Sequence, residues 1–136
     1  MHLPPNTIIA SGPVIIENKK VLLNREKKES GITSWFFPGG EVEDFDKSLE
    51  EACRREVKEE MGIEVEIIKP LRTLLHKRPE KEDQLVILVH YHAKRIGEIK
   101  PGKEIIEWGW YDIYNLPENC APNVFKIIED YIQENK

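Results

Sequence analysis

Residues Leu49 to Ile63 read LEEACRREVKEEMGI, and this stretch decides the fold because it is the strongest helix signal in the chain. Strong helix formers continue back to about Asp46. Asp46 or Ser48 is available as the N-cap, and Gly62 stands where a helix commonly ends. The pattern therefore predicts a helix that begins near Asp46 and ends at Met61.

A helical wheel of this segment places acidic residues on its apolar side. At about 100° per residue, an arc of roughly 140° holds the expected core stripe, which consists of Leu49, Ala52, Cys53 and Val57. Glu56 and Glu60 fall in the middle of that arc, and Glu59 lies on its flank. An ionised carboxylate that faces a core is costly unless it is paired or binds a metal. The wheel therefore predicts a cation here, and Mg²⁺ or Mn²⁺ suits a set of oxygen ligands.

A second interpretation of the same helix needs no metal. Runs of charge on helices usually form a solvated face, held by i,i+4 pairs such as Glu51 with Arg55. The two interpretations differ in whether Glu56 and Glu60 face the protein or the water.

Strand patterns lie on both sides of the helix. Before it, strands are expected between Thr7 and Glu17, at Val21 to Leu23 and at Trp35 to Phe37, with a polar loop from Arg25 to Thr33 and a stop at Pro38-Gly39-Gly40. After it, strands are expected at Val65 to Leu75, Gln84 to Ala93 and Ile105 to Ile113, and Pro122 begins a final amphipathic helix. This order predicts an α+β fold, an α/β/α sandwich around a mixed sheet.

Length and composition limit the kinds of protein that this chain can be. The 136 residues, 40% of them hydrophobic, are enough for one domain over residues 1–136. The net charge of −5 provides no basic field for nucleic acid. We expect a cytoplasmic protein without a membrane partner, because no signal pattern or apolar stretch of roughly 18 residues is present. Cys53 and Cys120 lack metal-ligand spacing and are expected to be reduced structural thiols.

The segment from Gly40 to Ile63 resembles a Nudix box, the signature of Nudix hydrolases. In words, the family pattern is a glycine, five residues, a glutamate, seven residues, then Arg-Glu-apolar-any-Glu-Glu-any-Gly-apolar. Residues Arg55 to Ile63 match the second half at every specified position. The first half is one residue longer than the pattern. Counting forward from Gly40 reaches Asp46, counting back from Arg55 reaches Lys47, and the early glutamate is absent by either count. We expect Asp46 to cap the helix instead.

The resemblance implies a fold and a set of site residues. The fold is a Nudix-like sandwich with a catalytic helix after the Gly-Gly loop and a second helix at the C-terminal end. Metal ions, Mg²⁺ or Mn²⁺, would be held by Glu56, Glu59 and Glu60, with the Gly39 carbonyl as a further ligand. Arg55 would orient one of the glutamates. Glu104 is the candidate for a later acid that serves as ligand or general base, and Glu107 is the reserve.

The resemblance also implies an activity, the metal-dependent hydrolysis of a diphosphate linkage. The first candidate substrate is a nucleoside diphosphate joined to another moiety, such as ADP-ribose or a dinucleoside polyphosphate. Pro79, sixteen residues after Ile63, resembles a feature of the ADP-ribose subgroup, although a proline in a polar loop is ordinary. The alternatives are a nucleoside triphosphate pyrophosphohydrolase that sanitises the nucleotide pool and a non-catalytic nucleotide-binding module. The expected partner is a small nucleotide, and a homodimer is open by analogy alone.

Overall fold

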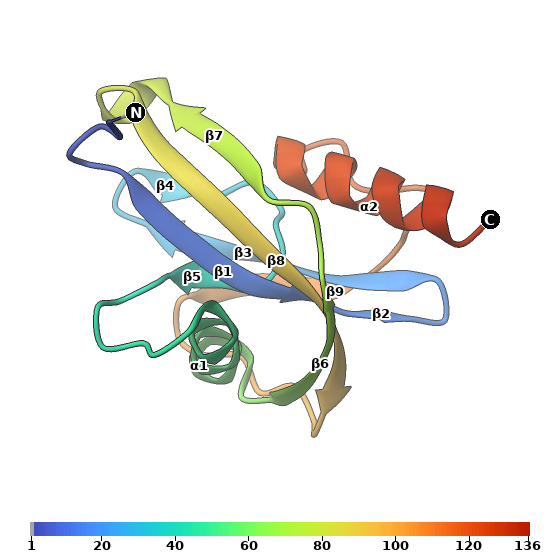
Figure 1. The fold of residues 1–136 in the computed structure, drawn as a ribbon. Helices are drawn as coiled ribbons and strands as arrows, with labels where there is room; N and C mark the ends of the chain where they lie inside the picture. The colour runs from blue at the N-terminus through green and yellow to red at the C-terminus, as the bar shows by residue number, and fades with distance from the viewer. Residues whose placement is uncertain (1) are drawn as a thin grey trace.

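Two β-sheets lie between two helices in the computed structural model, which describes residues 2–136 (Figure 1). In chain order the elements are β1 (Ile8–Val14), β2 (Ile16–Glu17), β3 (Lys20–Lys28), β4 (Gly31–Ile32), β5 (Gly40–Glu41), α1 (Leu49–Met61), β6 (Glu64–Pro70), β7 (Leu74–Arg78), the 3₁₀ helix η1 (Pro79–Lys81), β8 (Gln84–Ile96), β9 (Ile105–Asp112) and α2 (Pro122–Glu134).

The first sheet is mixed, as expected. It has the order β5-β1-β8-β6, and β7 also pairs with β8. Strands β1 and β8 run parallel, with Gly12 opposite His90, while the other pairs in this sheet are antiparallel. The second sheet is antiparallel and is built on β3, which pairs with β2, β4 and β9. The long strands β1 and β8 therefore form the centre of the first sheet, and β3 forms the centre of the second.

Alternating side chains of β3 connect the sheets to the two helices. Leu22 packs in one core cluster with Val57 and Met61 of α1. Val21 and Leu23 belong to a different cluster, which contains Val124, Ile127 and Ile128 of α2. Because neighbouring strand residues point to opposite faces, α1 and α2 cover opposite sides of the strands, as Figure 1 shows. The expected α/β/α sandwich is confirmed.

Helix α1 begins three residues later than the start near Asp46 that the sequence suggested. Its N-cap is Ser48, whose hydroxyl accepts a hydrogen bond from the Glu51 N–H at 3.0 Å. At the other end Gly62 has a φ of 68°, and its N–H donates to the Lys58 carbonyl at 2.9 Å. The prediction that Asp46 caps the helix was therefore wrong, and the Asp46 carboxylate binds Arg55 instead.

Two other segments differ from their predicted structure. The polar loop predicted from Arg25 to Thr33 is largely a hairpin of β3 and β4, because β3 continues to Lys28 against β9 and β4. The aromatic segment at Trp35 to Phe37 makes only isolated bridges, one between Asn24 and Phe36 and one between Trp35 and Cys120. Both cysteines are buried free thiols. Among the described residues, neither helix has the length and apolarity needed to cross a bilayer.

Candidate functional site

The Pro38-Gly39-Gly40 loop lies directly against β1, and the contact is between main-chain atoms of the two segments. A Cβ added to Gly12 would overlap the Pro38 carbonyl, and a Cβ on Gly39 would lie 2.6 Å from the Ser11 carbonyl oxygen. Gly39 also has a φ of +151°, which residues with a side chain rarely adopt. The two glycines therefore allow a close approach that fixes the Pro38-Gly39-Gly40 loop over the N-terminal sheet.

The same loop contacts two glutamates of α1. The Gly39 N–H donates a hydrogen bond of 2.6 Å to Glu60 Oε1. The carboxylate of Glu56 packs against the Cα of Gly40, where an added Cβ would overlap it. Only 13% of the Glu56 side chain is exposed, whereas 60% of the Glu59 side chain is exposed. Glu56 and Glu60 therefore face the loop and the strands, and Glu59 lies at the rim.

Arg55 joins the loop to the glutamates. Its Nη1 lies 3.0 Å from Glu56 Oε1 and 3.4 Å from both carboxylate oxygens of Glu59. Its Nη2 donates to the Glu41 carbonyl at 3.2 Å. Burial raises the pKa of Glu56 above its ordinary value, and the adjacent guanidinium opposes that rise. Arg55 therefore favours the ionised form of Glu56 and limits where its carboxylate can lie.

Asp46 holds Arg55 in place. Its two carboxylate oxygens accept hydrogen bonds from Arg55 Nε and Nη2, both at 2.8 Å, and Oδ2 also accepts the Glu43 N–H at 2.9 Å. Only 2% of the Asp46 side chain is exposed. The hydrogen bonds from Arg55 are the main cause that lowers the pKa of Asp46 to about 2. In the forward count from Gly40, Asp46 occupies the place of the glutamate that the first half of the box lacks, and the extra residue follows it.

Asp46→Asn is expected to destabilise the protein at neutral pH by an amount that shrinks in acid. The folded pKa of about 2 lies below the ordinary value of 3.8. The stabilisation from the ionised carboxylate is therefore complete above the unfolded pKa and is lost as the pH falls through the folded pKa. Urea unfolding at about pH 7 and at about pH 2.5 measures the two differences. Asp44→Asn, an exposed acid of the same loop, is the matched control, and a difference that does not change with pH would contradict this role.

Glu26 is a site residue that the sequence analysis missed. Only 4% of Glu26 is exposed, and its carboxyl group lies within hydrogen-bonding reach of that of Glu60. Burial is the main cause that raises the pKa of Glu60 well above its ordinary value, and contact with Glu26 raises it further. The sequence pattern that points to Glu26 is alternation along a strand, which places Leu22, Asn24 and Glu26 on one face. It was hidden because the segment after Asn24 was expected to be a loop.

Among residues 2–136, the side chains of the other two predicted acids form no hydrogen bond or ion pair with this cluster. Glu104 is exposed in the turn before β9, where its main-chain carbonyl accepts the Lys27 N–H at 3.0 Å. In the described part of the chain, its side chain has no hydrogen bond or ion pair with the α1 glutamates. Glu107 instead pairs with Arg25 at 2.9 Å. The roles of Glu104 and of the Gly39 carbonyl stay predictions.

The carboxylate cluster fits a hard divalent cation by its chemistry. Glu26, Glu56, Glu59 and Glu60 offer only oxygen atoms, which Mg²⁺ and Mn²⁺ prefer. Arg55, which Asp46 already binds, opposes the negative charge of Glu56 and Glu59. Within residues 2–136, no three acidic, histidine or cysteine side chains are already grouped around one point. The residue types therefore fit such an ion, and the side chains would have to converge on it.

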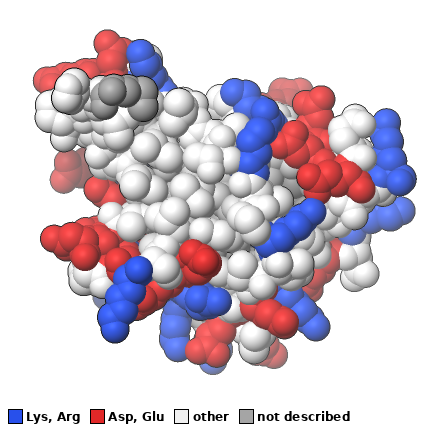
Figure 2. Space-filling view, viewed as in Figure 1, with Lys and Arg blue, Asp and Glu red and all other residues white. Residues whose placement is uncertain are grey.

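The surface around this cluster is acidic on one side. In Figure 2, acidic side chains gather at the left of the molecule, where Figure 1 shows the loop between β5 and α1. That loop contains the exposed acids Glu43 and Asp44, and the exposed Glu41 lies just before it at the end of β5. An anionic substrate would be repelled by this edge unless cations were bound there, so the charge distribution also favours a metal-dependent site.

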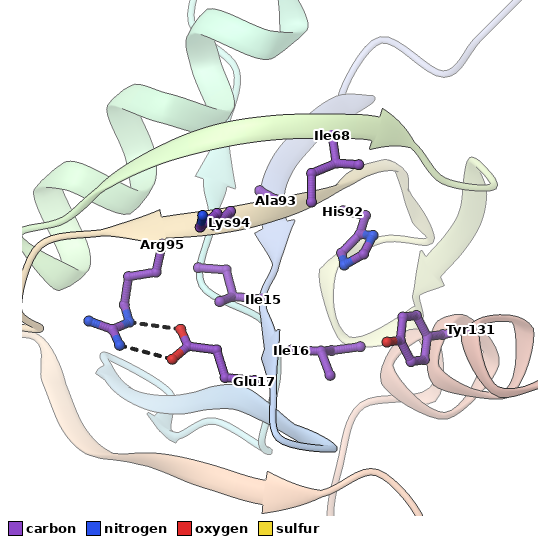
Figure 3. A pocket seen from close by; sticks show the side chains of 9 residues that line it. All are labelled: Ile15, Ile16, Glu17, Ile68, His92, Ala93, Lys94, Arg95 and Tyr131. Carbon is purple, nitrogen blue, oxygen red and sulfur yellow. Dashed lines mark hydrogen bonds and ion pairs between the residues drawn. The ribbon is translucent and has the colours of Figure 1, made fainter. Parts of the chain in front are cut away.

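A separate hollow lies away from the carboxylate cluster. Its volume is about 520 Å³ and it lies between β2, β6, β8 and α2 (Figure 3). Its lining residues are Ile15, Ile16, Glu17, Ile68, His92, Ala93, Lys94, Arg95 and Tyr131. Glu17 binds Arg95 through two hydrogen bonds of 2.9 Å across it. None of these residues comes from α1 or from the Gly39-Gly40 loop, so the hollow does not belong to the carboxylate site.

Comparison with known proteins extends the likeness well beyond the box. The family model of the NUDIX domain matches residues 7–131. An ADP-ribose pyrophosphatase of Methanocaldococcus jannaschii is 31% identical over 129 residues, which cover 92% of this chain and 73% of that protein. An 8-oxo-dGTP diphosphatase of Proteus vulgaris is 34% identical over 74 residues, 54% of this chain and 65% of that protein. The crystal structure of a MutT protein from Methanosarcina mazei Go1 has a TM-score of 0.82 at 26% identity, and the match covers 100% of this chain and 99% of that one.

Proposed function

Because the chain belongs to the Nudix family and is a Nudix-type pyrophosphohydrolase, we propose that its substrate is a nucleoside diphosphate joined to a second group, with ADP-ribose as the first candidate. The observation that carries this choice is the likeness to an ADP-ribose pyrophosphatase over 92% of the chain. That likeness includes the segments outside the box. We infer a metal requirement met by Mg²⁺ or Mn²⁺.

The residues of the site have separate roles in this proposal. Glu56, Glu59 and Glu60 would hold the divalent ions. When bound, such an ion neutralises charge on the diphosphate and lowers the pKa of the water that attacks phosphorus. Arg55, fixed by Asp46, holds the Glu56 carboxylate in one orientation and keeps it ionised. Glu104 stays our candidate for a further ligand or general base.

The second candidate is a nucleoside triphosphate, cleaved to a monophosphate and pyrophosphate. It is favoured by the likeness to an 8-oxo-dGTP diphosphatase, which covers 54% of this chain. We rank it lower because the matched part is shorter. Pro79 does not separate the two candidates, since it begins the 3₁₀ helix η1 between β7 and β8, where a proline is ordinary turn chemistry.

A panel of nucleotides tests the substrate. With Mg²⁺ or Mn²⁺ present, we expect ADP-ribose to give AMP and ribose 5-phosphate with a higher kcat/KM than any nucleoside triphosphate or dinucleoside polyphosphate. Products are separated by chromatography, and a chelator should stop the reaction because the ion supplies several kcal/mol of transition-state stabilisation. Pyrophosphate release from a triphosphate at a higher kcat/KM would replace the first candidate with the second. Absence of turnover on the whole panel would count for a binding module.

A further inference from the structure

Strand β3 places a second acid against the glutamates of α1. Glu26 is 4% exposed, and its carboxyl group meets that of Glu60, which also accepts the Gly39 N–H. Lys28 is the cation beside this pair, at 3.4 Å from Glu26 Oε2, but 55% of its side chain is exposed. An exposed lysine pair contributes little. Two acids in contact inside the protein therefore have almost no fixed positive charge to offset them.

Asn24 provides an independent observation at the same place. Its relative exposure is 0%, and neither its Oδ1 nor its Nδ2 has a hydrogen-bond partner among the described residues. It lies two residues before Glu26 and two after Leu22, which packs on α1. Alternation along the strand therefore directs all three side chains to the α1 side of β3. Buried amides without partners are rare and costly, so an unpartnered amide beside two acids indicates a place where a ligand or its water belongs.

The strand pairing changes at this same point. The register between β3 and β9 shifts between Arg25 and Glu26, so that Glu107 faces Arg25 but Ile105 faces Glu26. The extra residue, Ile106, is on β9, so the alternation along β3 continues through Glu26. Irregularities of this kind are common next to active sites.

We propose that Glu26 is a further ligand of the divalent ion, supplied by β3 opposite the ligands of α1, and that the Asn24 amide binds a water on that ion. This inference rests on the proposed function, because it assumes an ion at the α1 glutamates. If both were ionised, Glu26 and Glu60 would repel each other, and a cation between them would offset that repulsion. Such an ion would also give the Asn24 amide the partner that the protein does not provide. The ion would then be held from two elements rather than from one helix.

Calorimetric titration with Mn²⁺ alone tests the inference without any substrate. We expect Glu26→Gln to weaken Mn²⁺ binding by about 10-fold to 100-fold, the usual effect of losing a group that supports a metal site. The change removes charge at nearly constant volume, so the fold should be kept and is checked by circular dichroism. Glu66→Gln, an exposed acid on β6, is the matched control and should bind as the wild type does.

The outcomes separate this inference from the proposed function. If the wild type binds Mn²⁺ and Glu26→Gln binds it equally well, Glu26 is not a ligand and the inference is overturned while the metal-dependent function stands. If the wild type binds no Mn²⁺, both fail. If Glu26→Gln does not fold, Glu26→Asp is titrated in its place, because it keeps the carboxylate on a side chain that is one carbon shorter. Weaker Mn²⁺ binding in that variant supports the ligand role, and unchanged binding overturns it.

Discussion

Glu60→Gln is expected to lower turnover by about 100-fold or more while the protein stays folded. A glutamine keeps an oxygen that can accept the Gly39 N–H, which Glu60 binds at 2.6 Å. It removes the negative charge that Glu60 would present to a bound ion, and with it part of the several kcal/mol of transition-state stabilisation that the ion contributes. Each loss of about 1.4 kcal/mol lowers the rate by a factor of ten. Because burial raises the pKa of Glu60 and so favours its neutral form when no ion is bound, a neutral amide should fit there as well as the acid does, and the metal-free variant should melt at the same temperature as the wild type or higher. Steady-state kinetics and thermal melts measure both effects.

The choice of control for this variant depends on the structure. Glu50 is on the same helix and is exposed, but its Oε1 accepts a hydrogen bond from the Tyr91 hydroxyl at 3.2 Å. Glu66→Gln removes one exposed charge without such a contact and should leave kcat unchanged. Near-equal activity of the Glu60 and Glu66 variants would show that Glu60 does not serve the reaction.

Gly12→Ala should have the largest effect on the fold. The added methyl would overlap the Pro38 carbonyl and lie 2.8 Å from the Gly39 Cα, and both contacts are with main chain, which cannot turn away as a side chain does. Overpacking of this kind costs about 3 kcal/mol or more. The loop that positions Glu60 would also be displaced, so turnover should fall together with stability. Urea unfolding measures the first effect and the specific activity of the folded fraction measures the second.

Gly31→Ala separates the overlap from the general effect of replacing a glycine. Gly31 has a φ of +120°, but an added Cβ would meet nothing within 4 Å. We expect a loss of about 1 to 2 kcal/mol from backbone strain and an unchanged specific activity. A Gly12 variant that is as stable and as active as the Gly31 variant would mean that β1 and the loop can separate without consequence.

The helix and its acids could be predicted because their signals are local. Periodicity along fifteen residues is sufficient to place Ala52, Cys53 and Val57 in the core, and all three are buried. It also places Glu56 and Glu60 on that side, where the structure finds them partly buried. The alternative of a purely solvated face, with Glu51 bound to Arg55, does not hold, since Arg55 binds Asp46 and Glu56.

The partners of these acids could not be predicted because they come from elsewhere in the chain. Glu26 is thirty-four residues before Glu60, and nothing in NREKK shows that the strand continues through it. Its burial depends on pairing with β9, about eighty residues later. The sequence predicts a cap at Asp46 because this residue precedes a helix, and only the folded loop shows that its carboxylate turns toward Arg55. The positions of Glu26 and Asp46 therefore both depend on contacts with residues distant in the sequence or outside their own segment.

The contact between Asp46 and Arg55 also bears on how sequences of this kind are recognised. The chain is one residue longer than the family pattern between these positions, and the acid is one carbon shorter. The two departures occur together, and a two-point contact of 2.8 Å is still made. This segment differs from a pattern of fixed spacing and a glutamate in two ways, although the Arg55 guanidinium still forms an ion pair with a carboxylate from the loop. In this chain, a longer loop and a shorter acid together still allow the contact with Arg55.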